Sequence, residues 1–404
     1  MINYTIDELM SRLGCEKFPE RWREIYGEAL SIYNNDENPL LHPRHYDHLH
    51  EAYKVFDGEL LEIYKRAVSL LAENAELSLF FCILCRALRD RATIQRDIAQ
   101  MAVPTAPEGS DPLPYDMLTA LSLCQSYPAF YQQMRAHNVP EDILFESLKI
   151  PEKCVALHLR RSGKPRLTSF DWYQHAYDGR LYRVGRLQLE FPQGTPGIYR
   201  VFENKDGKIV AFANLPVHRD GFPLGSKNYE DEEGSFTATL EETDDAYIGY
   251  PYLPNGHIST EKMSLPKSEW SIKLKGGDPI VGLHIPPDEP FGNDIVEDAI
   301  SGAKKLLATC YPEYKYKAFF CASWLCDPEL INILGENANI SKFCGRFIPL
   351  SAKSNAKDVF GYVYRAYGDD IDVASLPENT SLQKALKKHY LSGNAIYVMH
   401  GVFF

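Results

Sequence analysis

Apolar residues in the first part of the chain recur at helical spacing. In the interval 60–71 they follow one face of a helix, at Leu60, Ile63, Tyr64, Ala67, Leu70 and Leu71. The intervals 77–98 and 117–134 predict two further helices. Thr5 and Glu8 have the spacing of a capping box, which predicts a helix start. The pattern therefore predicts a helical domain over residues 1–150.

After about residue 164 the pattern changes to short strands. Residues 180–191 alternate apolar and polar side chains, which is typical of a half-buried strand. Residues 197–213 contain Asp206-Gly207 at their centre, a strong signal for a hairpin turn. The intervals 236–252 and 270–285 add further strand candidates.

The last 120 or so residues alternate strands and helices. A strand at 280–285 leads into a helix, and a second strand at 317–323 leads into a helix that starts from Asp327. Further strands are predicted over 343–350, 359–367 and 395–404, with a helix that begins at the capping box Thr380–Gln383.

This order favours α/β or α+β architecture with a mixed sheet. Because the helices come first, we expect an α+β protein: a helical N-terminal domain over 1–150, then a mixed-sheet domain with flanking helices over 151–404. The second domain has a β-rich part at 165–285 and a strand–helix–strand part at 280–404.

The composition argues against some classes of protein. The 404 residues include 43 Lys and Arg against 55 Asp and Glu, a formal net charge of −12. This balance argues against a nucleic-acid partner bound through bulk charge. Aromatic residues make up 12%, with 25 Tyr and 20 Phe, which argues against a disordered chain.

Other features of the sequence indicate the cellular compartment. The start of the sequence lacks the basic and apolar regions of a secretory signal, and no apolar run approaches the ~20 residues of a membrane-spanning helix. The nine cysteines are an odd number scattered through a large chain, which fits reduced thiols. We expect a cytoplasmic protein without a membrane partner.

Two motifs contain residue types that bind metal ions. Cys82 and Cys85 form a CxxC pair, but no second pair follows, and their apolar neighbours favour buried helix cysteines. The segment 42–50 contains His42, His45, His48 and His50 without a completing Cys or Glu pattern. We expect no metal, with a solvated helix entrance at the histidines.

Four segments carry a family resemblance. Leu157–Gly163, Tyr182–Glu190, Val281–Pro286 and Ala318–Leu330 resemble bacterial acyltransferase-like proteins that have a helical N-terminal domain and a GNAT-like C-terminal domain. The resemblance covers nearly the whole chain. It implies a GNAT-type fold and transfer of an acyl group from acyl-coenzyme A (acyl-CoA) to a small-molecule acceptor, which we expect to be an amine.

The resemblance also implies where the cofactor lies. In GNAT-like enzymes two neighbouring strands splay apart, and the acyl-pantetheine arm lies between them. The pyrophosphate lies at the N-terminus of the helix after the first of these strands, where free amides favour an anion. Here the two strands would be 280–285 and 317–323, which places Ile285, Gly292 and Asn293 at the cofactor.

The loop over 286–293 departs from the family pattern. It has one glycine, no basic residue, and the two carboxylates of Asp288 and Glu289. Two hypotheses follow. Either other cations hold the cofactor, for which Arg183 and Arg186 are the candidates, or the chain is a catalytically inactive GNAT-like protein that binds a ligand or a partner.

Acylation of an amine needs a base, a donor to the carbonyl oxygen and an acid for the leaving thiolate. His284 lies near the end of the first strand and is the candidate base; a packed strand histidine is the alternative. Ser323 and Cys321 lie two residues apart on the second strand and are candidate donor, acid or nucleophile. Small residues packed beneath a helix are the alternative. A cysteine hydrolase that uses Cys321 with His284 is a third hypothesis for the function.

Aromatic residues supply the candidates for binding the acceptor. Trp172 and Tyr177 lie in an aromatic cluster before Asp178-Gly179, and Trp324 follows the second strand. Their rings can line a pocket, although aromatic packing would give the same pattern. The oligomeric state is left open by the sequence.

Overall fold

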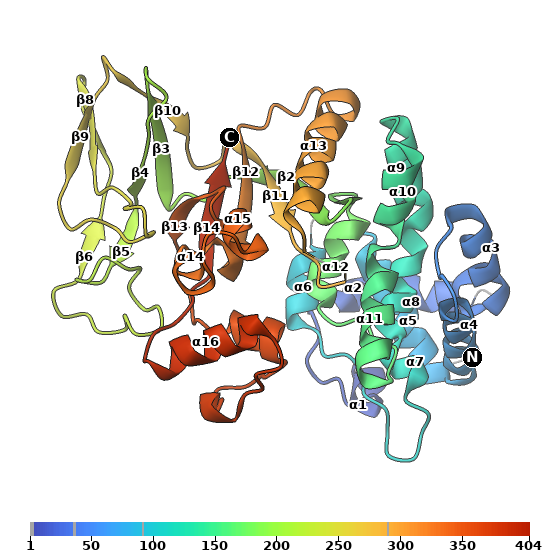
Figure 1. The fold of residues 1–404 in the computed structure, drawn as a ribbon. Helices are drawn as coiled ribbons and strands as arrows, with labels where there is room; N and C mark the ends of the chain where they lie inside the picture. Colours follow the sequence, from blue (N-terminus) through green and yellow to red (C-terminus); the bar gives the residue numbers. More distant parts are fainter. Residues whose placement is uncertain (1–3, 35–37, 91–92, 289–290) are drawn as a thin grey trace. The chain divides into compact units, whose positions relative to one another are not determined.

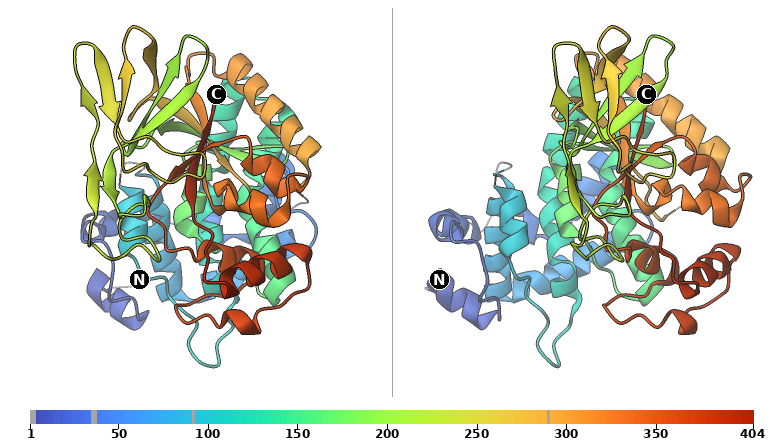
Figure 2. Two further views of the ribbon diagram at one scale, coloured as in Figure 1. Left: turned by 60° about the vertical axis from the view of Figure 1, so that its left-hand side comes forward. Right: turned by 90° about the vertical axis from the view of Figure 1, so that its left-hand side faces the viewer.

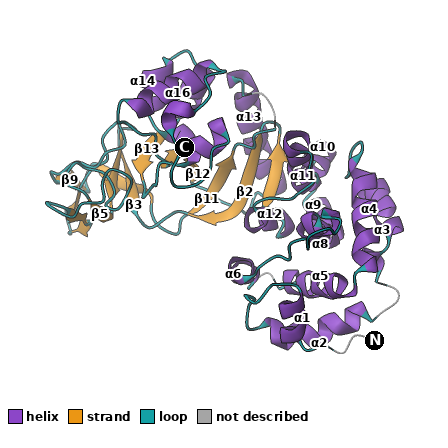
Figure 3. Cartoon of the chain, turned by 90° about the horizontal axis from the view of Figure 1, so that it is seen from below, coloured by secondary structure: helices purple, strands orange, loops and turns teal. Residues whose placement is uncertain are grey.

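The computed structural model describes residues 4–34, 38–90, 93–288 and 291–404, except for the side chains of Ile94, Gln95, Asp171, Gln174 and Tyr177. The chain forms two compact units, Met1–Val184 and Gly185–Phe404 (Figure 1). The first unit is almost entirely helical and the second carries the sheets, as the colouring of Figure 3 shows. The predicted α+β class is therefore confirmed, whereas the predicted domain boundary at residue 150 stays a prediction.

The first unit is built from helices, followed by one strand at its end. They are α1 (Ile6–Arg12), α2 (Trp22–Tyr33), η1 (Pro39–Leu41), α3 (Pro43–Tyr53), α4 (Leu60–Glu73), α5 (Ala75–Leu88), α6 (Ile94–Gln100), α7 (Leu113–Asp116), α8 (Leu118–Leu123), η2 (Cys124–Ser126), α9 (Tyr127–Ala136), α10 (Glu141–Leu148), α11 (Ile150–Ser162), α12 (Phe170–Tyr177) and β1 (Leu181–Val184).

Helix α5 is the core of this unit. It is buried on almost all sides, which explains why its sequence is apolar without a polar face. Trp22 of α2 packs against Phe80 of α5 with ring centroids 5.9 Å apart in an edge-to-face arrangement. Cys82 and Cys85 are fully or almost fully buried in α5, in agreement with the prediction of buried helix cysteines.

The predicted helix signals are confirmed in part. Thr5 and Glu8 form the capping box of α1, and the predicted stripe over 60–71 is the buried face of α4. Two predicted helices are divided. The interval 77–98 contains α5 and α6, and the interval 117–134 is interrupted by η2 before α9. Pro128 lies in the first turn of α9, where a proline costs no hydrogen bond.

The second unit contains a main sheet whose strands lie in the order β2 (Leu187–Gly194), β11 (Pro279–His284), β12 (Ala318–Ser323), β14 (Met399–Phe403), β13 (Ile348–Ser351). Strands β11 and β12 are parallel and are connected through helix α13 (Asn293–Cys310). The other pairs are antiparallel. The sheet is therefore mixed, as predicted.

Smaller sheets complete the second unit. Their strands are β3 (Tyr199–Asn204), β4 (Ile209–Ala213), β5 (Leu215–Val217), β6 (Phe236–Ala238), β7 (Glu241–Glu242), β8 (Ala246–Gly249), β9 (Met263–Pro266) and β10 (Trp270–Leu274). The turn Asp206-Gly207 joins β3 to β4, as predicted. The remaining helices are η3 (Trp324–Cys326), α14 (Glu329–Leu334), α15 (Asn339–Cys344), η4 (Phe360–Tyr364), η5 (Val373–Ser375) and α16 (Ser381–Leu391).

The main sheet is covered on both faces. On one face, Ile280, Ala318 and Phe320 pack against residues of β3, β4 and β10 in a buried apolar cluster. On the other face lies α13, as Figure 2 shows; Phe319, adjacent to Phe320 in β12, approaches Lys304 of α13. This alternation along β12 is the pattern of a strand buried on both faces.

Two strand predictions in this unit were wrong. The interval 359–367 forms the helical turn η4, because Phe360 and Tyr364, four residues apart, both turn toward α16: Phe360 packs on Tyr390, and the Tyr364 hydroxyl donates to the Gln383 carbonyl. The interval 180–191 is not one strand: Gly185, with φ of +53°, separates β1 from β2.

In the described part of the chain, the length and hydropathy of each single helix fall short of what a membrane crossing needs. Helices α4 and α5 meet that requirement only as a pair, and they are bent by 115° relative to each other.

Candidate functional site

Strands β11 and β12 separate along their length. They are paired at Ile280–Ala318, Val281–Phe319 and Gly282–Phe320, and within the described strands no later pair joins them. Beyond this point each strand remains paired on its other side: His284 with Gln188 of β2, and Ser323 with Met399 of β14. The two strands therefore diverge toward their carboxyl ends while the sheet stays intact around them.

Sheet alternation separates the candidate residues into two sets. Gly282 and Phe320 are register partners, so His284 belongs to the same face as Phe320, two residues further along. Cys321 and Ser323 belong to the opposite face, where α13 lies. Where the two strands diverge, His284 therefore lies on one face of the sheet, and Cys321 and Ser323 lie on the other.

His284 has a carboxylate partner. Its Nε2 lies 3.2 Å from Oε2 of Glu190, which extends from the neighbouring strand β2. Glu190 is 6% exposed, whereas the side chain of His284 is 27% exposed. A carboxylate can only accept, so the Nε2–H donates to Glu190 and the lone pair lies on Nδ1. A histidine oriented in this way is equipped to act as a base.

Gly282 leaves room for this pair. A Cβ atom at Gly282 would lie 3.2 Å from Nε2 of His284 and 3.3 Å from Cβ of Glu190. It would also lie 2.6 Å from Oε1 of Gln193, a distance that real Cβ atoms do not show. The position that a Cβ of residue 282 would take is therefore closely packed by the side chains of three residues that come together from two strands.

The candidate residues at the end of β12 make contacts that hold the local structure together. The Ser323 hydroxyl accepts a hydrogen bond from Leu325 N at 3.1 Å and caps η3. Cys321 is 1% exposed, and its carbonyl accepts from the thiol of Cys326 at 3.6 Å. Trp324 is 7% exposed within η3. Asp327, which follows η3, accepts from Glu329 N and Tyr397 N, so it caps and connects segments as its sequence position suggests.

In the loop before α13, the negative charge of Asp288 is offset by the nearby Arg186. The guanidinium of Arg186 lies 3.9 Å from Oδ1 of Asp288 and 5.5 Å from the ring of Phe291. The side chains of Arg186 and Asp288 are only 3% and 10% exposed. The predicted cation Arg186 is thus at this loop, and it offsets one of the carboxylates that set the loop apart. Glu289 lies outside the described residues.

A second arginine lies at the start of α13. Nη2 of Arg346 donates to Oδ1 of Asn293 at 2.6 Å, and the same guanidinium pairs with Glu297 one turn later. Gly292 is the N-cap of α13 and, having no side chain, leaves the first amides of the helix without a side-chain cap. Ile285 follows β11 directly, before this loop.

Three predicted residues belong to the first unit. Arg183 is 2% exposed in β1, where its backbone N–H donates to the Ser147 hydroxyl at 2.9 Å. Trp172 packs against the buried cluster of Ile150, Ala176 and Leu181. The side chain of Tyr177 lies outside the described residues.

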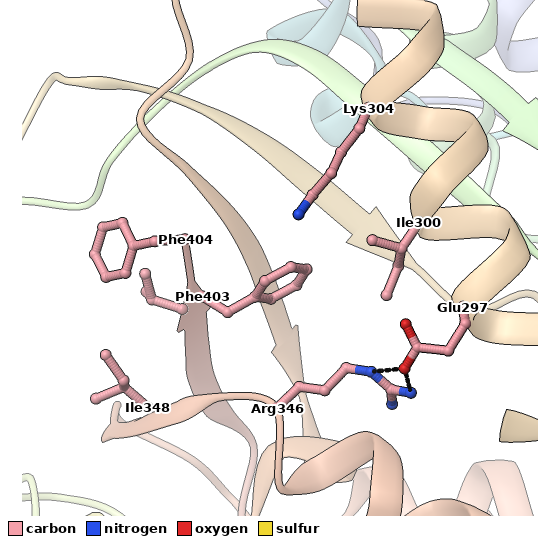
Figure 4. A pocket seen from close by; sticks show the side chains of 8 residues that line it. Glu297, Ile300, Lys304, Arg346, Ile348, Phe403 and Phe404 are labelled. Carbon is pink, nitrogen blue, oxygen red and sulfur yellow. Dashed lines mark hydrogen bonds and ion pairs between the residues drawn. The ribbon is translucent and has the colours of Figure 1, made fainter.

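A cavity of about 430 Å³ lies beside α13 (Figure 4). Its walls include Ile300, Ile348 and Phe403, with the Arg346–Glu297 ion pair at one end and the ammonium of Lys304 directed toward its interior. None of the residues predicted for the site lines it. Among the described residues no group of three or more His, Cys, Asp or Glu side chains has the arrangement of a metal site.

Glu190, Gln193 and Arg346 were missed by the sequence analysis. Glu190 and Gln188 alternate with Leu187 and Leu189, a pattern interpreted as a half-buried strand with a solvated polar face. In the structure both polar residues are 6% exposed. The signal that could have identified Glu190 is the presence of two polar residues at alternate positions of a strand whose two faces are both buried.

Comparisons with known proteins agree with this arrangement. The model of an N-acyltransferase N-terminal domain matches residues 48–179, and the model of a GNAT-like C-terminal domain matches residues 181–403. A search of curated proteins finds no match.

Solved structures with the same fold include acyltransferases with bound ligands. A mutant acyltransferase in complex with octanoyl-CoA has a TM-score of 0.61 and 16% identity, over 99% of both chains. An acyltransferase in complex with CoA and 10C-teicoplanin has a TM-score of 0.62 and 17% identity, over 98% of both chains. At these identities the likeness concerns the fold. With more than half of the sequence matched by the second domain model, the chain belongs to the GNAT-like acyltransferase family in which that domain follows an N-acyltransferase N-terminal domain.

Proposed function

We propose that this protein transfers an acyl group from acyl-CoA to the amine of a small-molecule acceptor. The observation that carries the proposal is the divergence of β11 from β12 after Gly282 and Phe320. It creates the setting in which GNAT-like proteins hold the acyl-pantetheine arm. The similar structures that contain octanoyl-CoA or CoA support the same cofactor here.

His284 is the proposed general base. The amine nitrogen attacks the thioester carbon, one N–H proton passes to Nδ1 of His284, and the carbon–sulfur bond breaks. Glu190 holds the imidazole in the required tautomer and stabilises the imidazolium that forms. The products are an amide and CoA, whose thiolate takes up a proton.

Ser323 is the proposed proton donor to the leaving thiolate. Its oxygen accepts from Leu325 N, so the hydroxyl proton is available to another acceptor. It lies at the end of β12, at the divergence. Cys321 receives no role as a nucleophile, because its side chain is only 1% exposed.

The phosphates of the cofactor are proposed to lie at the N-terminus of α13. The amides of Gly292, Asn293 and Asp294 favour an anion there, and the helix dipole adds to this preference. Arg186, beside Asp288, and Arg346, beside Asn293, are the cations that lie next to this loop. Because Arg186 offsets Asp288, the acidic loop no longer favours the hypothesis of an inactive binding protein.

An assay for release of CoA thiol from octanoyl-CoA tests the proposal. The protein is incubated with octanoyl-CoA and a panel of primary amines, and the amide is identified by mass spectrometry. We expect amide formation, with a fall of about 10²–10⁴-fold in kcat for His284→Ala. Matched substitution of the partly exposed His137 by Ala should leave the rate unchanged. Equal rates for His284→Ala and the wild type would contradict the role of His284.

A further inference from the structure

The cavity beside α13 is bordered by one stripe of that helix. Glu297, Ile300 and Lys304 follow one another at intervals of three and four residues, so they lie on the same helix face, and all three line the cavity. From the sheet, Phe403 of β14 faces them across a volume of about 430 Å³ (Figure 4). A cavity of this size is within the range of small-molecule sites in proteins.

Phe403 gives this cavity an aromatic wall. Its ring stacks on that of Phe319 in β12, with centroids 5.0 Å apart and an interplanar angle of 15°. Phe347 packs edge-to-face against the same ring at 5.4 Å. Ile300, on the opposite wall, is 6% exposed. Because its neighbours already hold the ring of Phe403, a flat apolar group can pack against it with little loss of side-chain freedom.

The two cations of the cavity differ in their partners. The guanidinium of Arg346 donates from Nε to Glu297 at 3.1 Å and from Nη2 to Asn293 at 2.6 Å, so its charge is balanced. The ammonium of Lys304 is directed toward the interior of the cavity, 5.9 Å from the centroid of the Phe319 ring. No carboxylate in the described part of the chain pairs with Lys304. The cavity therefore has one uncompensated positive charge.

This charge lies away from the proposed phosphate site. The phosphates are placed by the proposed function at the first turn of α13, near Asn293, and Lys304 follows eleven residues later. At ~1.5 Å per residue the two positions are ~16 Å apart along the helix. The Arg346–Glu297 pair lies at the end of the cavity nearer to Asn293. A ligand in the cavity and phosphates at Asn293 therefore occupy different parts of α13.

We propose that this cavity binds a small aromatic carboxylate, with the carboxylate on Lys304 and the ring packed against Phe403. The inference is independent of the proposed function. A neutral ring gains only the apolar contacts, and a cationic ligand is repelled by Lys304. Because the Arg346–Glu297 end is neutral, a second negative charge on the ligand finds no uncompensated cation there.

Isothermal titration with 2-naphthoate tests the inference. The neutral 2-naphthylmethanol keeps the ring and lacks the charge, and decahydro-2-naphthoate keeps the charge and lacks the flat ring. The variant is Lys304→Met, and the control is Lys305→Met, which removes the adjacent exposed lysine of the same helix. Each protein is titrated at low ionic strength with and without saturating octanoyl-CoA, and its melting transition is recorded.

We expect 2-naphthoate to bind the wild type and Lys305→Met with equal Kd values of about 1 mM or below. In Lys304→Met the Kd should rise about fivefold or more. Both analogues should bind the wild type more weakly than 2-naphthoate does. Saturating octanoyl-CoA should leave the Kd of 2-naphthoate within about twofold, since two separate sites without coupling do not affect each other.

Several results would overturn the inference. Absence of 2-naphthoate binding, or equal Kd values for the two lysine variants, would remove the site at Lys304. Equal affinity for either analogue would remove the assigned ligand class. Competition by octanoyl-CoA would show that the ligand occupies the cofactor site instead of a separate one. These results leave acyl transfer untouched, because the assay for release of CoA thiol tests that activity on its own.

Discussion

Nε2 of His284 lies 3.2 Å from Oε2 of Glu190, and the two residues come from neighbouring antiparallel strands. Glu190 is the register partner of Gly282, two residues before His284, so the contact runs diagonally across the pair of strands. The absence of a side chain at Gly282 lets the imidazole reach back to the carboxylate. The contact favours the tautomer of His284 in which Nε2 carries the proton.

Removing the charge of Glu190 should therefore slow the chemistry without affecting cofactor binding. In Glu190→Gln the amide no longer requires Nε2 to carry the proton, and the imidazolium loses its partner. We expect kcat to fall about 10²-fold or more, with the Kd of octanoyl-CoA unchanged. Steady-state kinetics measure this. Glu203→Gln, which alters only the pair with Lys273 on β3 and β10, is the control. Equal loss in both variants would point to a general effect of charge.

A methyl group at Gly282 should disrupt the site more than the fold. In Gly282→Ala the added Cβ meets Gln193 and His284, which must move. We expect at least about tenfold loss of activity and a melting temperature lowered by a few degrees at most. In Gly194→Ala, at the end of β2, the nearest atom is 3.8 Å from the new Cβ, so activity should persist. Full activity of Gly282→Ala would show that the close approach of Gln193 and His284 to Gly282 is not needed for catalysis.

Arg186 should matter for binding of acyl-CoA. Arg186→Met removes a cation from the loop before α13 and leaves the buried carboxylate of Asp288 without this counter-charge. We expect the Kd of octanoyl-CoA to rise about tenfold or more. Arg200→Met removes the surface ion pair with Glu242 and serves as the control. Isothermal titration distinguishes them, and identical Kd values for the two variants would exclude a role of Arg186.

Glu152 in α11 should make the stability of the protein depend on pH. Burial raises the pKa of its carboxyl to about 8, although its Oε2 accepts from Phe56 N. Between the ordinary value and 8 the folded state binds more protons than the unfolded state, so stability falls as the pH rises through this range. Glu152→Gln is uncharged throughout and can still accept from Phe56.

We therefore expect Glu152→Gln to match wild type near pH 4.5 and to exceed it by ~2–4 kcal/mol near pH 8.5. Urea unfolding at the two pH values measures the difference. Parallel stability profiles for the two proteins would show that Glu152 does not titrate in this range.

Much of the fold could be predicted from local signals. The capping boxes at Thr5 and Thr380, the turn at Asp206-Gly207 and the strand–helix–strand order around α13 were all predicted correctly, because each depends on contacts within a few residues. The interval 359–367 was predicted wrongly because its alternating aromatics are oriented by α16, which lies further along the chain. Tertiary packing decided its structure.

In the candidate site, too, some residues could be predicted from local sequence signals and others could not. His284 could be selected from its place at a strand end, whereas its partner Glu190 and the neighbouring Gln193 are separated from it by about ninety residues of sequence. Only the pairing of β2 with β11 brings them together. Arg346 likewise reaches Asn293 through the folded chain. Sheet register and long side chains determine these contacts, and neither is expressed in a local pattern.

Isothermal titration of the wild-type protein with octanoyl-CoA, with desulfo-CoA and ADP as controls, tests whether this protein binds acyl-CoA. We expect saturable binding with a micromolar Kd, weaker binding of ADP, and a Kd that rises in Arg186→Met and stays unchanged in Glu190→Gln. Absence of binding by a protein that shows a cooperative melting transition would rule out acyl-CoA as its substrate.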